Sequence, residues 1–168
     1  MPTVTEPPAK LARLTIANLD QMVARDRPGK DLEAQYNPKE LNLEHAVTWA
    51  PVPTSKGDHP ELTFGGGTPR TLAMELFFDT FEEGTDVQKE YVGPLQELLL
   101  VMSQTQGEEK KRPPRVALVW GEDLPRFVAV VASVAVKYTM FLPGGRPVRA
   151  TCSVKFIEAA RSERKAGR

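Results

Sequence analysis

The chain has 168 residues, of which 40% are hydrophobic, and its 22 Lys and Arg residues are balanced by 22 Asp and Glu residues. That length predicts one domain with a core of its own, and zero formal net charge argues against binding nucleic acid or an anionic membrane through bulk charge. The single cysteine, Cys152, excludes an intrachain disulfide and a zinc site built from several cysteines. We interpret Cys152 as a small buried side chain in a strand.

The two ends of the chain differ in composition from the part between them. Residues 1–10 are polar and rich in proline, residues 11–158 carry the patterned segments, and residues 159–168 are polar again. We therefore expect a flexible N-terminal segment, one domain and a C-terminal tail. No basic region followed by an apolar stretch opens the chain, and no run approaches the ~18 apolar residues that cross a bilayer. We expect no secretory signal and no membrane insertion, and we expect the chain to stay in the cytoplasm unless it is carried out as part of something larger.

The first half of the domain shows the two-residue period of strands. Residues 11–16 and 32–36 are short strand candidates, and residues 41–49 alternate between apolar and polar side chains. This alternation predicts a strand with one buried face. His45 falls on the apolar face, where we expect a partly buried, hydrogen-bonded histidine. Residues 51–60 form a loop with three prolines.

Three successive glycines at residues 65–67 separate two strand-like segments, residues 61–64 and 72–78. A phosphate-binding loop would lead from its glycines into a helix N-terminus, usually with a Lys-Ser or Lys-Thr pair behind them. These glycines lead through Pro69 into a strand instead. We therefore expect them to serve a tight connection or the close approach of a neighbouring backbone.

The period changes to three and four between residues 86 and 103, which predicts a helix. Its apolar positions are Val87, Tyr91, Leu95, Leu98 and Met102. Pro94 interrupts this pattern, because a proline inside a helix costs about 3 kcal/mol. We expect either a kink there or a regular helix that begins near Pro94, in its first turn.

The last third of the domain predicts a long hairpin. Residues 127–142 are apolar at every even-numbered position, and residues 148–156 alternate again after the turn PGGR. The odd-numbered face of the first strand is small and mostly apolar over half its length. We expect that face to be covered by the domain itself or by a neighbour.

These patterns define one predicted core and one predicted interface. The core, with the helix packed on it, includes Leu72, Met74, Leu76, Phe78, Val130, Val134, Tyr138 and Val154. The candidate subunit-interface residues are Ala129, Val131 and Ala135, the glycines Gly65, Gly66 and Gly67, and the turn residues Pro143, Gly144 and Gly145.

No residue pattern indicates catalysis or metal binding. His45 and His59 have no Cys, Asp or Glu at a spacing that resembles a metal site. The acidic residues Glu82, Glu83 and Asp86 stand at the start of the predicted helix, where the helix dipole accounts for them. We therefore expect no enzyme activity, no cofactor and no metal.

Three segments together resemble a known family. They are "YNPKELNLEHAVTW", "PELTFGGGTPRTLAMELFFDTFEEGTDV" and "YTMFLPGGRPVRATCSVKF". They are similar to the tail-tube-like domain of contractile injection systems, and above all to the baseplate adaptors that carry a LysM domain after it. The similarity covers residues 30–158. The polar tail leaves no room for a LysM domain, so we expect any contact with peptidoglycan to belong to another subunit.

The resemblance implies a fold and partners. The fold is a mainly β, tail-tube-like barrel of two packed sheets with one α-helix. The implied function is structural: a homo-hexameric ring at the baseplate that joins the inner tube to the spike hub, with the inner tube protein, the spike protein and other baseplate subunits as partners. Such a particle is assembled in the cytoplasm and released with its subunits. Two alternatives stay open, an inner-tube or tube-initiator subunit of the same machine and a stand-alone β-sandwich that binds a ligand or peptide.

Overall fold

The structure is a computed structural model that describes residues 10–23, 27–53, 57, 59–102 and 112–159. The expected N-terminal segment and C-terminal tail lie almost wholly outside these residues.

Most strands belong to one antiparallel sheet. Its order is β4-β1-β9-β10-β11-β8-β5. Its strands are β1 (Thr15–Asn18), β4 (Leu32–Glu33), β5 (Leu41–Glu44), β8 (Thr71–Asp79), β9 (Arg115–Val119), β10 (Phe127–Phe141) and β11 (Pro147–Glu158). Two further pairs are β2 (Met22–Val23) with β3 (Arg27–Pro28) and β6 (Val47–Val52) with β7 (Glu61–Gly67). The prediction of a mainly β fold is confirmed. Within the described residues the large sheet ends at β4 and β5 and does not close into a barrel.

Strand β10 connects the two halves of the sheet, and it pairs over different lengths on its two sides. β11 follows it almost from end to end, whereas β9 pairs only with Phe127 to Val130. The register with β11 shifts between Val131 and Ser133, which marks a β-bulge. Since strand side chains alternate between faces, one extra residue exchanges the faces of all residues beyond it. Odd-numbered side chains are buried before the bulge, and even-numbered ones are the more buried after it.

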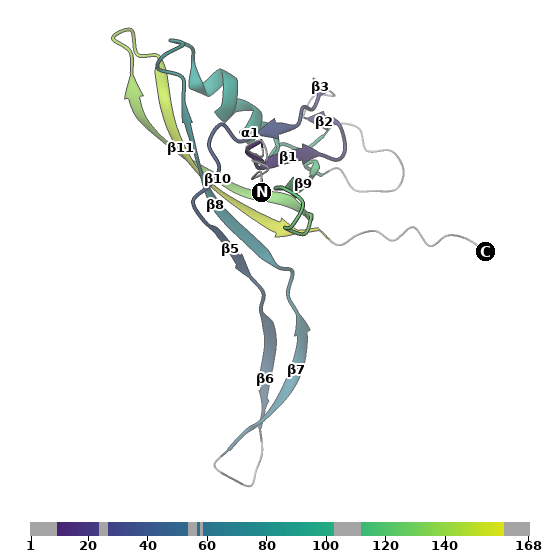
Figure 1. Cartoon of the computed structure of the whole chain (residues 1–168). Coiled ribbons are helices and arrows are strands. Elements are labelled where there is room, and N and C mark those ends of the chain that lie inside the picture. Colours follow the sequence, from purple (N-terminus) through teal and green to yellow (C-terminus); the bar gives the residue numbers. More distant parts are fainter. Residues whose placement is uncertain (1–9, 24–26, 54–56, 58, 103–111, 160–168) are drawn as a thin grey trace, which may run out of the picture.

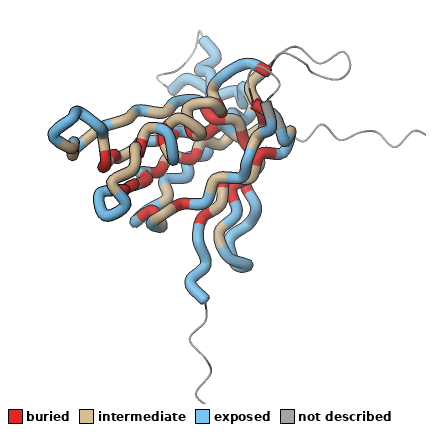
Figure 2. The backbone as a smooth tube through the Cα atoms, turned by 90° about the horizontal axis from the view of Figure 1, so that it is seen from above, coloured by how far each residue is buried: buried red, intermediate tan, exposed pale blue. Residues whose placement is uncertain are grey.

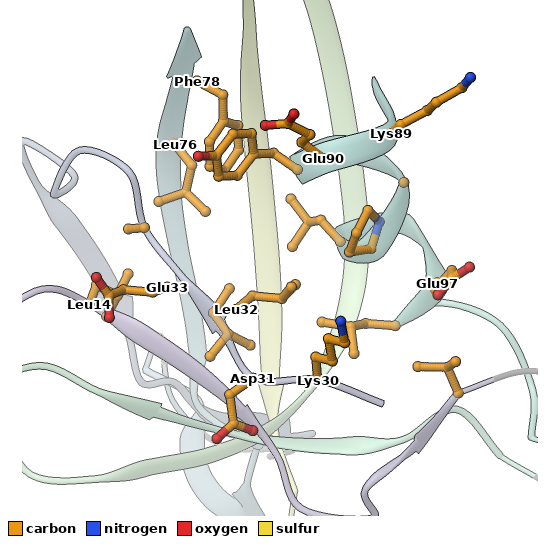
Figure 3. Close-up of a pocket in the computed structure, with 18 of the residues that line it drawn as sticks. Leu14, Lys30, Asp31, Leu32, Glu33, Leu76, Phe78, Lys89, Glu90 and Glu97 are labelled. Atoms are coloured by element: carbon orange, nitrogen blue, oxygen red, sulfur yellow. The ribbon is translucent and has the colours of Figure 1, made fainter. Parts of the chain in front are cut away.

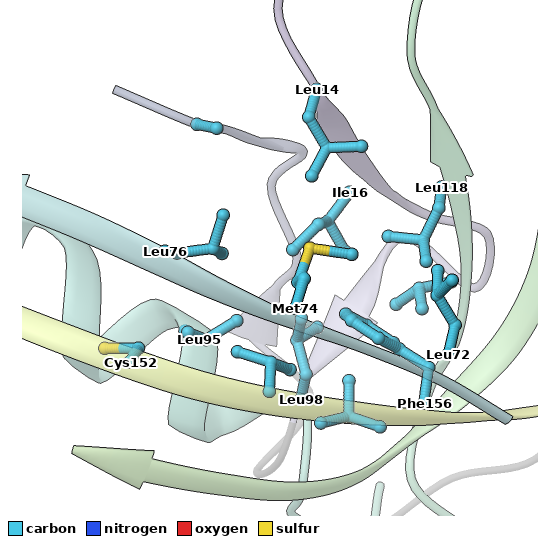
Figure 4. Close-up of a cluster of buried hydrophobic side chains, with 14 of the residues drawn as sticks. Leu14, Ile16, Leu72, Met74, Leu76, Leu95, Leu98, Leu118, Cys152 and Phe156 are labelled. Carbon is cyan, nitrogen blue, oxygen red and sulfur yellow. The ribbon is translucent and has the colours of Figure 1, made fainter. Parts of the chain in front are cut away.

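The core lies between the long strands and a cover formed by β1, β9 and the helical segment (Figure 4). Figure 2 shows that the buried residues gather within the body of the domain. Its members include Ile16, Leu118, Leu72, Met74, Leu76, Phe78, Val154, Phe156, Leu95 and Leu98. The predicted core is confirmed for the β8 residues and Val154, and Val134 and Tyr138 pack against it partly buried. The prediction is wrong for Val130, which is only partly buried and outside this cluster because it precedes the bulge.

The helical segment is shorter than predicted and changes type next to the proline. A π-helical stretch, η2 (Gln88–Val92), continues into α1 (Gly93–Glu97), with Pro94 in the first turn of α1. The Gly93 N–H donates to the Gln88 carbonyl oxygen, and a Cβ on Gly93 would lie 2.9 Å from that oxygen. Glycine thus permits the π turn, and the expectation that the regular helix begins near Pro94 is confirmed.

Strands β6 and β7 form an arm that extends beyond β5 and β8, away from the body of the domain (Figure 1). The predicted strand over residues 41–49 is broken at His45 and Ala46 into β5 and β6. Its apolar face is covered only at Leu41, which packs against the core, whereas Val47 is 47% exposed and Trp49 55% exposed. His45 is exposed as well, so the expectation of a partly buried histidine is wrong.

Candidate assembly interface

Two unpaired edges flank the four strands β10, β11, β8 and β5 within the described residues. One belongs to β5, which pairs with β8 on one side and with no described strand on the other. The other belongs to β10 beyond Val130, where its pairing with β9 stops. An unpaired edge presents a row of free backbone N–H and C=O groups that can bind another strand. These two edges are therefore the first candidates for contact with other chains.

The exposed face of the four strands β10, β11, β8 and β5 is mostly polar. A shallow groove of about 290 Å³ crosses it, lined by Glu40, Asn42, Ala73, Met74, Glu75, Ser133, Ala135, Ser153, Val154 and Lys155. Ala135 pairs with Ser153, and Ser153 pairs with Glu75, so the three form one row across the face. Ala135 is exposed, which keeps it available as an interface candidate.

Two of the proposed interface residues lie in the core instead. Ala129 has no exposed surface and Val131 is 5% exposed, and both belong to the core cluster. The prediction that these side chains are accessible in an isolated subunit is wrong. The physical reason is the bulge, which places Ala129 and Val131 on the opposite face of β10 from Ala135.

The three glycines lie in β7, where the arm leaves the body, and not in a turn. A Cβ on Gly65 would approach the Thr48 Oγ1 to 2.9 Å, and Gly66 adopts φ +112°, which favours glycine. The register shifts between Thr48 and Trp49 at this place, and the Thr48 hydroxyl donates to the Gly66 carbonyl oxygen. The expected close approach of a backbone is thus found within the chain itself.

The turn residues Pro143, Gly144 and Gly145 are exposed at the far end of the β10–β11 hairpin, opposite the arm (Figure 1). The Leu142 N–H donates to the Arg146 carbonyl oxygen, and Gly145 adopts φ +87°. The structure therefore separates three groups of candidate residues: the exposed face with Ala135, the root of the arm, and the tip of the hairpin.

Sequence reasoning missed the apolar side of the arm as a candidate interface. Trp49 pairs with Phe64 and Pro51 pairs with Leu62, so these four side chains share one face. The Trp49 and Phe64 rings meet edge to face with centroids 5.5 Å apart. Phe64 is 58% and Leu62 60% exposed. One signal was present: Pro51 within this segment is a residue that strands accept only at edges or bulges.

A cavity of about 590 Å³ opens between β4 and the helical segment (Figure 3). Leu14, Leu32, Leu76 and Phe78 line it, and among the charged residues around it are Lys30, Asp31, Glu33, Glu90 and Glu97. Its described lining contains no Ser, Thr, Cys or His. Nor do the described residues contain a cluster of three or more His, Cys, Asp or Glu side chains that could hold a metal.

Two ion pairs fix the ends of the ladder between β8 and β11. Arg149 Nη2 lies 2.7 Å from Asp79 Oδ2, and Arg70 Nε donates to Glu158 Oε2 at 3.0 Å. The Phe81 N–H and the Arg149 guanidinium lower the pKa of Asp79, and the Arg70 guanidinium lowers the pKa of Glu158. Both ion pairs therefore tie β8 or the residue before it to β11.

Unpaired strand edges such as those of β5 and β10 can pair with strands of other chains. In agreement, a family model described as "Contractile injection system tube protein" matches residues 10–167. The chain belongs to this family, which is a family of structural tube components and not of enzymes. A search of the curated proteins finds no match. None of the helices in the described part is long and apolar enough to cross a membrane.

Proposed function

We propose that this chain forms a closed ring of six copies at the baseplate of a contractile particle and joins the inner tube to the spike hub. The observation that supports the ring is the pair of unpaired edges on β5 and on β10 beyond Val130, at the two sides of the four antiparallel strands β10-β11-β8-β5 of the large sheet. The position at the baseplate rests on the resemblance of its motifs to baseplate adaptors.

The strand directions favour a ring. Each neighbour in the order β10-β11-β8-β5 is antiparallel, so β5 and β10 run in opposite directions. β5 of one copy set against β10 of the next therefore continues an antiparallel sheet from subunit to subunit. Contacts between two different surfaces of one protein close into a ring when the rotation allows it.

The charges on the two edges fit the same contact. Exposed Glu40 and Glu44 stand at and just before β5, on the side of the sheet that carries the groove. Lys137 is the one charged residue of β10 beyond the bulge, and it is exposed. Opposite charges on facing edges favour this pairing over others.

Cross-linking tests the ring. Glu44→Cys with Lys137→Cys, treated with a short bis-maleimide, should give covalent oligomers that stop at six chains. The matched control pairs Glu44→Cys with Lys155→Cys on the central strand β11, which can be bridged only within one chain. Wild type is the blank, because Cys152 is buried. A double variant that stays monomeric would contradict the ring, and a series ending at another number would contradict six.

The second candidate is a subunit of the main tube, and the description of the matched family favours it. Copy number separates the two. Quantitative mass spectrometry of purified particles should find one ring of this chain for each spike in the baseplate case. A number that grows with tube length would assign the chain to the tube. In either case, the proposal places the chain in the cytoplasm during assembly and in the released particle afterwards.

A further inference from the structure

The cavity between β4 and the helical segment has no part in the proposed ring. Its volume is about 590 Å³, which lies within the range of small-molecule sites. Its floor is apolar, and Ile16, Leu76 and Leu95 on that floor are at most 3% exposed. Because protein interiors are close-packed, with few voids larger than a water molecule, a hollow of this size among core side chains is suited to hold a guest molecule.

The helical segment keeps this hollow open. Gly93 and Pro94 line it at the place where the π turn passes into α1, and neither carries a long side chain. Glycine is required here, since a Cβ on Gly93 would lie 2.9 Å from the Gln88 carbonyl oxygen. Single π turns within helices are rare and occur frequently at functional sites. The backbone beside the cavity is therefore of a kind often found beside binding sites.

One end of the cavity combines aromatic rings with negative charge. The rings of Phe78 and Tyr91 stack there with centroids 4.7 Å apart, and Glu90 lies beside them, whereas its neighbour Lys89 extends away from the cavity (Figure 3). The Glu90 carboxylate has no ion pair or hydrogen bond with another described residue. Burial and the negative charges of Glu90 and Glu83 raise the pKa of Tyr91. Since carboxylates and aromatic faces both attract cations, this end suits a positively charged group.

The other charges around the cavity do not cancel that of Glu90. Lys30 and Asp31, one charge of each sign, lie together across the cavity from Glu90 (Figure 3). Arg13 Nε lies 3.8 Å from Glu33 Oε1, so these two charges offset each other. The end of the cavity with the two stacked rings thus remains negative.

We propose that this cavity binds a linear aliphatic amine, with its alkyl chain along the apolar floor and its ammonium group beside Glu90 and the Tyr91 ring. The side chains of the floor are almost fully buried, so the entrance admits a slender chain better than a broad ring system. A bound chain contacts residues of both β4 and α1 and therefore stabilises the folded protein. The inference goes beyond the proposed ring and does not depend on it, because a single chain forms the whole cavity.

Titration of the purified full-length chain with n-octylammonium chloride, followed by calorimetry and methyl NMR, tests the proposal. Saturable binding with a Kd of about 1 mM or tighter is expected for an amphiphile of this size. The largest shifts should fall on the methyl groups of Ile16, Leu32 and Leu95, which line the cavity. Absence of saturable binding, or largest shifts at methyl groups outside the lining, would overturn the proposal.

Two further probes separate the charge from the alkyl chain. n-Octanoate has a similar chain and the opposite charge, and n-butylammonium has the same charge and a shorter chain. Each should bind at least about tenfold more weakly than n-octylammonium. Equal binding of octanoate would remove the role of Glu90, and equal binding of butylammonium would remove that of the apolar floor, so either result contradicts the proposal.

Two substitutions locate the ligand. Ala34 is 5% exposed and lines the cavity, and Ala34→Leu should fill it and weaken n-octylammonium binding at least about tenfold. Glu90→Gln, at an exposed site, should weaken the same binding at least about threefold and leave that of n-octanol unchanged. The control Glu82→Gln, exposed and outside the lining, should change neither. Unchanged binding in Ala34→Leu or Glu90→Gln, or an equal loss in the control, would refute the site. The ring stands or falls separately, by the Glu44–Lys137 cross-link.

Discussion

The bulge in β10 makes a sharp prediction about two alanines six residues apart. Ala129 has no exposed surface and faces the core, whereas Ala135 is exposed on the other face. Replacing Ala129 by Glu forces a carboxyl group into the core next to Val116, its cross-strand partner. The same change at Ala135 places the carboxyl group in water.

The cost at Ala129 can be estimated in two parts. Keeping a glutamate neutral at pH 7 costs about 4 kcal/mol, since its ordinary pKa is near 4.3 and each pH unit is worth about 1.4 kcal/mol. The added volume costs about 1–3 kcal/mol more in a packed core. The total, about 5–7 kcal/mol, is comparable to the whole stability of a small domain. Ala135→Glu should change the free energy of unfolding by about 0.5 kcal/mol or less.

Urea unfolding of the purified chains, followed by far-ultraviolet circular dichroism, measures both values. The penalty of Ala129→Glu should also shrink toward pH 4, because a group with a raised folded pKa costs stability only above its unfolded pKa. Equal stability of the two variants would refute the assignment of faces. If Ala135→Glu is the one that unfolds, the bulge lies elsewhere and both alanines must be reassigned.

Three further predictions test other parts of the structure. Phe78→Ala should lower the free energy of unfolding by about 3–5 kcal/mol, because Phe78 is 5% exposed and stacks on Tyr91. The control Phe77→Ala, at an exposed site, should cost at most about 1.5 kcal/mol in the same urea titration. The Cys152 thiol should not react with a disulfide reagent at pH 8 until the chain is unfolded, because burial raises its pKa to about 11; rapid reaction of the native chain would contradict its place in the core. Burial alone would raise the pKa of Asp20, but the Arg112 side chain and the Arg115 N–H outweigh burial and lower the pKa. The stability from this contact is therefore present above the ordinary carboxyl pKa, and it is lost as pH falls through the lower pKa of the folded state. Asp20→Asn should therefore cost about 1.5–3 kcal/mol at pH 7 and flatten the loss of stability below about pH 4, which unfolding curves across pH will measure.

The sequence predicts the interior of this fold better than its interface. Alternation along β8 and β11 identifies core residues correctly, and Pro94 marks the place where the helix changes type. Both signals are local, because each strand face or turn is encoded by adjacent residues. The expectation that the chain has no catalytic or metal site also rests on local patterns. No residues that could act together stand at a suitable spacing in the sequence.

The errors have two physical sources. A single extra residue in β10 reverses the faces of the strand, and period-two reasoning carries the wrong parity past it, as at Ala129, Val131 and Val130. Along residues 41–49 the alternation predicts an apolar face but does not say what covers it. The same pattern suits a core strand and an exposed arm, so the alternation alone does not decide whether Trp49 is buried.

The distribution of charge on the edges also bears on how copies pair. A β5 edge meeting another β5 edge would bring Glu40 and Glu44 against the same residues, and two β10 edges would bring Lys137 against Lys137. Such like-charge contacts disfavour a twofold dimer built on either edge. The mixed contact pairs opposite charges, although exposed pairs of this kind are worth only about 0–1 kcal/mol each. In the proposed ring the charges therefore favour the partner edge, while backbone pairing between the edges supplies most of the binding energy, so a subunit with an intact core can still fail to assemble when an edge is altered.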